Sequence, residues 1–149
     1  PEQAAQLVFY APGSDQAALK QFLAALAALR EQHPGLAALC ALDQALSADL
    51  QKALAALPSI TIRIVSTLEQ ASIGTHGQVL VTVADPTAWQ ATLGAMAAGR
   101  PVIQLVRPQG LAADPAALSV PLGDVAALVN QLAALLKAHE QPATLHEVL

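Results

Sequence analysis

The chain alternates short apolar runs with longer stretches of helical periodicity, and this alternation limits the fold more than any other feature. Apolar runs rich in β-branched residues are typical of buried strands. Strands are predicted near residues 6–10, 36–41, 60–65, 79–83 and 101–106, with a short edge strand at 118–120. Helices of ten or more residues between strands require crossover connections, which produce a parallel sheet covered on both faces. We therefore expect an α/β, Rossmann-like three-layer domain with a mostly parallel sheet.

Local signals mark where the intervening helices begin and end. Helices are predicted from Asp15 to His33, from Ser47 to Leu57, from Thr87 to Ala98, from Asp124 to about His139, and at Thr144–Glu147. Asp85 followed by Pro86 is typical of an N-cap with proline at the first helical position. Gly99 is the expected C-terminal glycine of the third of these helices.

Composition indicates one domain and argues against nucleic acid as a ligand. The 149 residues match a single domain, 1–149, without an internal linker or repeat. The formal charge is −4 and the seven Lys and Arg are scattered, whereas phosphate backbones require a basic face. Charged residues make up only 12% of the chain, which favours a surface completed by a second lobe or a partner subunit.

Cysteine and histidine usage excludes further classes of site. Cys40 is the single cysteine and lies in an apolar run, so we expect a buried thiol and a reducing, cytoplasmic location. The four histidines lack metal-ligand spacing, so no metal and no cofactor is expected. No apolar stretch approaches the roughly 20 residues of a membrane span. The start at Pro1, without Met, predicts that the chain is a fragment of a longer protein.

Candidate substrate-binding residues follow the predicted strands, because open α/β sheets bind ligands beyond the carboxyl ends of their strands. The loops at these ends are Pro12–Ser14, Cys40–Asp43, Ser66–Thr67, Asp85–Thr87 and Arg107–Gly110. The candidates in and beside them are Gly13, Ser14, Asp85, Thr87, Trp89, Arg107 and Gly110.

Each of these candidates also has a purely structural interpretation. Asp85 either contacts a ligand or only caps the helix. In both cases, free backbone N–H groups of Thr87 and Ala88 at the helix start would be able to bind a phosphate. Trp89 stacks on a nucleobase or fills the core or an interface. Arg107 and Gly110 either bind a phosphate or belong to an ordinary solvated loop.

Residues 94–103, Gly-Ala-Met-Ala-Ala-Gly-Arg-Pro-Val-Ile, with the strand 79–85 before them, resemble the C-terminal lobe of GT-B glycosyltransferases of retaining family 4. In that family a helix ends in Glu-Ala-Met-Ala-x-Gly and Pro-Val-Ile follows in the next strand. Pro121–Leu128 resembles the family's Gly-Asp-x-x-Ala-Leu helix start. The resemblance implies a nucleotide-sugar-binding lobe that works with an N-terminal acceptor lobe, in bacterial-type polysaccharide or glycoconjugate synthesis.

The chain departs from this family at the positions that carry its chemistry. Two family glutamates that face the donor align with Pro86 and Gly94, and the family's glycine-rich segment is here Thr87–Gln90. We therefore assign no catalytic residue and expect the isolated chain to be inactive. The alternative is a non-catalytic scaffold or protein-interaction domain that kept the fold. A receiver- or flavodoxin-like regulatory domain is a third interpretation, but the acidic cluster and strand-end lysine of a phosphorelay are missing.

Overall fold

A computed structural model describes residues 6–11, 16–33, 35–42, 48–49, 52, 60–64 and 69–140. Within these residues six strands form one parallel sheet in the order β3-β2-β1-β4-β5-β6. The strands are β1 (Leu7–Ala11), β2 (Ala38–Leu42), β3 (Ile60–Ile64), β4 (Val79–Val83), β5 (Val102–Val106) and β6 (Leu118–Pro121). This order confirms the predicted Rossmann-like α/β class, and every strand pair in the sheet is parallel.

The predicted strands are confirmed, with small shifts at their ends. β6 occupies the edge beside β5, where the short edge strand is expected. The prediction that residues 40–43 form a loop is wrong for Cys40, Ala41 and Leu42, which pair with β1 and β3. Cys40 is buried, as expected, and burial raises the pKa of its thiol to about 12.

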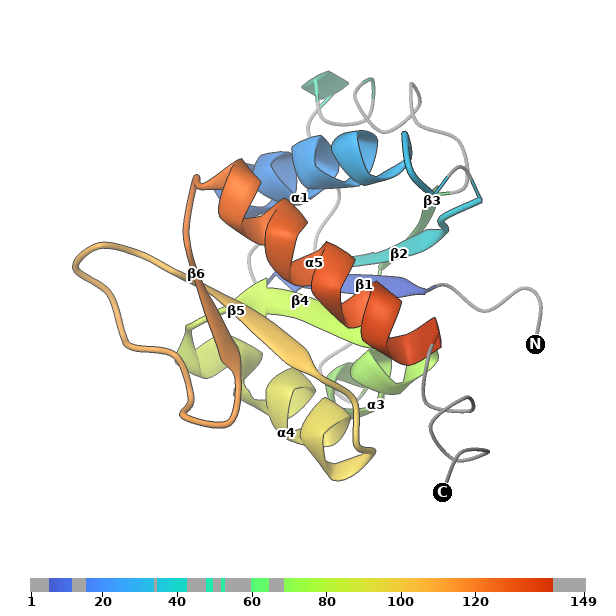
Figure 1. The fold of residues 1–149 in the computed structure, drawn as a ribbon. Coiled ribbons are helices and arrows are strands. Elements are labelled where there is room, and N and C mark those ends of the chain that lie inside the picture. Colours follow the sequence, from blue (N-terminus) through green and yellow to red (C-terminus); the bar gives the residue numbers. More distant parts are fainter. Residues whose placement is uncertain are drawn as a thin grey trace.

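Helices cover the sheet on both faces (Figure 1). On one face α1 (Gln16–Leu29) packs beside α5 (Val125–Glu140). On the other face lie α3 (Gln70–Ile73), the 3-10 turns η3 (Gly74–His76) and η4 (Pro86–Ala88), and α4 (Trp89–Ala97). No helix in the described part of the chain has the length and apolar character needed to cross a bilayer.

The helix predictions hold where they fall on described residues. The predicted helices at Asp15–His33, Thr87–Ala98 and Asp124–His139 correspond to α1, to η4 with α4, and to α5. Most of the Ser47–Leu57 helix and all of Thr144–Glu147 lie outside the described residues. Gly99 ends α4 with φ +77°, as a C-terminal glycine should. The short helix α3 is not among the predictions.

The core is built from leucine, valine and alanine on both sides of a buried sheet. All residues of β1, β2 and β4 are buried, as a parallel sheet covered by helices requires. On one face Phe9 stacks on Phe22 of α1 with ring centroids 5.0 Å apart. On the other face Gly74 approaches α4 so closely that an added Cβ would lie 2.6 Å from Ala95 Cβ. This approach leaves no space for a larger residue at Gly74.

Gln21 joins α1 to the turn between β6 and α5. Its side chain is 3% exposed. Nε2 donates to the carbonyl oxygens of Pro121 and Asp124, both at 3.1 Å, and Oε1 accepts from Gly123 N at 2.7 Å. One amide therefore satisfies three backbone groups about a hundred residues away, and it fixes where α5 starts against α1.

Asp85 caps the helical segment that follows β4. Its Oδ1 accepts from both the backbone N–H and the hydroxyl of Thr87, and Pro86 occupies the first position of η4. The Thr87 hydroxyl and then the Thr87 N–H hold the pKa of Asp85 below its usual value, although partial burial acts in the opposite direction. The predicted N-cap is confirmed.

We expect Gln21→Leu to lower the free energy of unfolding by about 2 kcal/mol, because three backbone groups lose their partner. Urea denaturation of the two proteins measures the difference. Lys20→Leu is the matched control: Lys20 is exposed on the same helix, and its change should stay within about 0.5 kcal/mol. A Gln21→Leu protein as stable as the parent would show that water replaces the side chain at this turn.

We expect Asp85→Ala to destabilise the fold by about 1 kcal/mol at neutral pH through loss of the cap. Folding lowers the pKa of Asp85, so its contribution is present above the unfolded value of about 3.9 and is lost as the pH falls through the folded value. The difference between the two proteins in urea denaturation should therefore shrink below about pH 4. Asp85→Asn keeps an acceptor and should cost much less. An undiminished difference at acid pH would contradict the role of the carboxylate.

Candidate functional site

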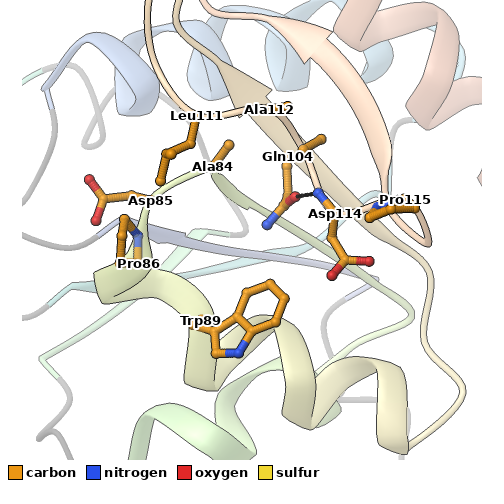
Figure 2. A pocket seen from close by; sticks show the side chains of 10 residues that line it. Ala84, Asp85, Pro86, Trp89, Gln104, Leu111, Ala112, Asp114 and Pro115 are labelled. Carbon is orange, nitrogen blue, oxygen red and sulfur yellow. Dashed lines mark hydrogen bonds between the residues drawn. The ribbon is translucent and has the colours of Figure 1, made fainter.

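A pocket of about 440 Å³ opens at the carboxyl ends of β4 and β5 (Figure 2). One wall is the start of α4 and the other is the connection from β5 to β6. Its lining consists of Ala84, Asp85, Pro86, Trp89, Gln104, Leu111, Ala112, Ala113, Asp114 and Pro115. The volume lies in the range of small-molecule sites. The pocket also lies beyond the carboxyl ends of the strands, where open α/β sheets bind ligands.

Gln104 lies on β5 and joins the two walls of this pocket. Its Nε2 donates to Thr92 Oγ1 of α4 at 3.3 Å, and its Oε1 accepts from Asp114 N at 2.6 Å. The dashed line in Figure 2 marks the second contact. Because Gln104 is almost fully buried, these hydrogen bonds fix its rotamer and hold the connection against the sheet.

The backbone N–H groups at the start of α4 already have partners. Thr87 N donates to the Asp85 carboxylate, Ala88 N to the Asp85 carbonyl, and Trp89 N to the Pro86 carbonyl. The expectation of free N–H groups at Thr87 and Ala88 is therefore wrong: the Asp85 carboxylate occupies the position that an anion would take. Figure 2 shows this carboxylate turned away from the pocket interior.

Trp89 lies on the surface of the pocket and is not a core residue. Its side chain is 42% exposed, and that of Leu111 on the opposite wall is 56% exposed. The interpretation of Trp89 as core filler is therefore wrong. A stacking or interface role stays open for this indole.

Arg107 and Gly110 lie in the turn that follows β5. Gly110 N donates to the Arg107 carbonyl at 3.1 Å, and residues 107–110 line a second hollow of about 430 Å³. The positive charge of Arg107 also makes a small contribution to the low pKa of Asp85. Neither Arg107 nor Gly110 lines the first pocket.

The structure thus groups part of the predicted set. Asp85 and Trp89 line the pocket, and Thr87 is hydrogen-bonded to Asp85. Arg107 and Gly110 belong to the adjoining turn. Gly13 and Ser14 lie outside the described residues. Among the residues described, no group of three His, Cys, Asp or Glu is arranged to hold a metal ion.

Sequence reasoning missed Gln104 and the 111–115 wall. The signal for Gln104 is present in the sequence, because it is the one polar residue within Val-Ile-Gln-Leu-Val, a strand expected to be buried on both faces. A buried amide needs partners, so it marks a place where other segments meet the strand. No comparable pattern marks residues 111–115.

Solved structures of the glycosyltransferase GlyE from Streptococcus pneumoniae TIGR4 are similar to this chain. The apo form superposes with a TM-score of 0.61 at 13% identity, covering 89% of this chain and 33% of GlyE. A second GlyE structure gives a TM-score of 0.60 at 13% identity, with 89% and 32% covered. No protein-family model and no curated protein matches the chain. The chain thus spans about a third of these neighbours' length, and the domain has a glycosyltransferase-like fold, consistent with a GT-B lobe.

Proposed function

We propose that the chain is the nucleotide-sugar-binding lobe of a two-lobed, family 4-like glycosyltransferase. The observation that carries the proposal is the superposition on GlyE over 89% of the chain. The Ala-Met-Ala-Ala-Gly-Arg-Pro-Val sequence at the end of α4 and the start of β5 supports the same assignment. An N-terminal lobe or partner subunit would supply the acceptor site. Cytoplasmic nucleotide sugars are the donors we propose.

The position of the pocket supports donor binding at this edge of the sheet. Asp85 and Trp89 line the pocket where β4 and β5 end, and the exposed Arg107 lies in the adjoining turn, where it would supply a cation for phosphate oxygens. Gly13 and Ser14, which follow β1 in the sequence, are also proposed for this site, and Gly110 and Thr87 would border the diphosphate. The binding energy would come mainly from Arg107 and apolar contact, because the N–H groups of η4 are occupied.

The same residues argue against catalysis by this chain alone. The two glutamate positions of the family hold Pro86 and Gly94, which have no acidic group. Asp85 is next to the first of these positions, but its Oδ1 accepts two hydrogen bonds from Thr87 and its carboxylate is turned away from the pocket interior. A non-catalytic scaffold with this fold is the alternative, and it differs from the donor lobe in binding no nucleotide.

We expect the isolated chain to release no nucleoside diphosphate from UDP-, GDP- or ADP-sugars, with or without an added acceptor sugar. The physical reason is that the chain offers neither the matched carboxylates nor an acceptor lobe. A coupled assay for released diphosphate, with a protein-free reaction as background, measures this. Release above background that is proportional to protein concentration would contradict the proposed inactivity.

We expect UDP, GDP or ADP to bind weakly, with a dissociation constant of about 1 mM, or about 4 kcal/mol. Backbone amide shifts in NMR titrations should concentrate at residues 85–90 and 107–111. Arg107→Ala should weaken binding by about two- to five-fold, the effect of one exposed charge contact.

Arg100→Ala is the matched control for this titration. Arg100 is also exposed and carries the same charge. It precedes β5 and therefore lies near the amino ends of the strands, opposite the pocket. The dissociation constant should not change in that variant. If none of the three diphosphates shifts any amide, the donor-lobe proposal is wrong and the scaffold alternative is supported.

A further inference from the structure

A hydrogen-bond donor faces the interior of the pocket between Trp89 and Leu111. The backbone N–H of Asp114 can only donate, so the Gln104 atom that it meets at 2.6 Å must be the oxygen. This contact turns Nε2 toward the side of the pocket formed by Pro86 and Trp89 (Figure 2). Nε2 carries two hydrogens, and within the described part of the chain its acceptor is Thr92 Oγ1 alone. One N–H is left for a ligand.

A hydrogen-bond acceptor lies on the other side of the same space. Figure 2 shows the Asp114 carboxylate directed toward the Trp89 side of the pocket. Its Oδ1 accepts from Ala116 N at 2.8 Å, and a carboxylate has about four lone-pair sites, so it can accept further hydrogen bonds. Gln104 Nε2 and the Asp114 carboxylate thus offer a donor and an acceptor to the pocket, and each side chain is fixed by a contact to the backbone.

The side chains around these two polar groups are largely apolar. Trp89 forms one wall and Leu111 the other, with Pro86 and Pro115 at the edges. A partly exposed indole beside a pocket is a stacking surface for a ring, whatever the ring's identity. The pocket of about 440 Å³ has room for such a ring.

The charges around the pocket disfavour a phosphate inside it. The lining contains no Lys, Arg or His. The Asp114 carboxylate faces the pocket interior, whereas the Asp85 carboxylate is turned away from it. Like charges at short range repel most strongly where apolar walls lower the effective dielectric constant. Arg107 lies in the adjoining turn, outside the lining. A phosphate would therefore stay at the mouth, on the Arg107 side.

We propose that this pocket binds an uncharged ring, stacked on Trp89, that accepts a hydrogen bond from Gln104 Nε2 and donates one to Asp114. The phosphates of the same ligand stay outside, beside Arg107. The assignment rests on the proposed function, because a nucleotide sugar carries two such rings, the nucleobase and the sugar. It adds a specificity role for Gln104 and Asp114, which the family resemblance does not provide.

NMR titrations with neutral rings and with a bare phosphate test the proposal. Trp89 is the only tryptophan in the chain, so the indole N–H resonance reports on the pocket directly. The probes are uridine, guanosine, adenosine, methyl α-D-glucopyranoside and pyrophosphate, each added to about 10 mM, above the dissociation constant of a weak ligand. We expect a ring probe to move the indole and Gln104 side-chain resonances. Pyrophosphate should leave both in place. A response to nucleosides assigns the pocket to the base, and a response to the glycoside assigns it to the sugar.

Three variants of the 149-residue chain separate the pocket from the rest of the surface. Gln104→Glu keeps an acceptor for Asp114 N–H but removes the free donor, so it should raise the dissociation constant by about five-fold. Trp89→Ala removes the stacking surface and should do the same, followed through the Gln104 side-chain amide. Leu93→Ala is the control: Leu93 is 43% exposed one turn further along α4 and does not line the pocket. Its effect should stay below about two-fold, as expected away from the site.

The outcomes distinguish this proposal from the proposed function. The pocket proposal is overturned if pyrophosphate moves the indole as strongly as a ring does, or if Trp89→Ala and Leu93→Ala weaken binding equally. It is also overturned, while the donor lobe stands, if a nucleoside diphosphate binds through Arg107 and no ring probe moves the indole. Ring binding with the expected variant effects, in the absence of any diphosphate binding, supports the pocket and removes the donor-lobe proposal.

Discussion

Burial of the parallel sheet on both faces is the constraint on which the rest of this structure depends. β1, β2 and β4 are buried along their whole length, so each face needs a continuous helical cover. With only 3% aromatic residues, that cover is made of leucine and alanine, and close approaches such as Gly74 against Ala95 replace bulky side chains. Such tight layers leave little space inside. The pocket accordingly lies where the chain leaves the sheet, at the carboxyl ends of β4 and β5.

Two buried glutamines connect segments that the sheet alone would not hold. Gln21 fixes the turn before α5 on one face, and Gln104 fixes the β5–β6 connection on the other. In a low-dielectric interior these hydrogen bonds are strong, and an unpaired amide would be costly, so each side chain permits one arrangement of its neighbours. The pocket owes its second wall to this effect, because Gln104 anchors the connection through Asp114 N.

The distribution of charge at the strand ends bears directly on the proposed donor site. The start of a helix after a strand is a common place for phosphate binding, but here the Asp85 carboxylate takes that position through Thr87. Arg107 lies in the adjoining turn, and Asp114 places a negative charge inside the pocket. If a nucleotide sugar binds at these strand ends, its phosphates would therefore lie beside Arg107 and one of its neutral rings would lie in the pocket.

The sequence by itself determined the strands, most helix ends and the cap at Asp85, because apolar periodicity, Asp-Pro at a helix start and glycine at a helix end act over a few neighbouring residues. It also placed Asp85, Trp89 and Arg107 at one edge, since parallel strands share their carboxyl ends. It did not reveal α3, whose four residues carry no periodic signal and which packs against α4. Only the tertiary structure decided that Trp89 is exposed and that residues 111–115 lie across the pocket from the start of α4. The position of residues 111–115 depends on the contacts of Gln104 with Thr92 and Asp114, and no local sequence pattern encodes which segments a buried side chain brings together.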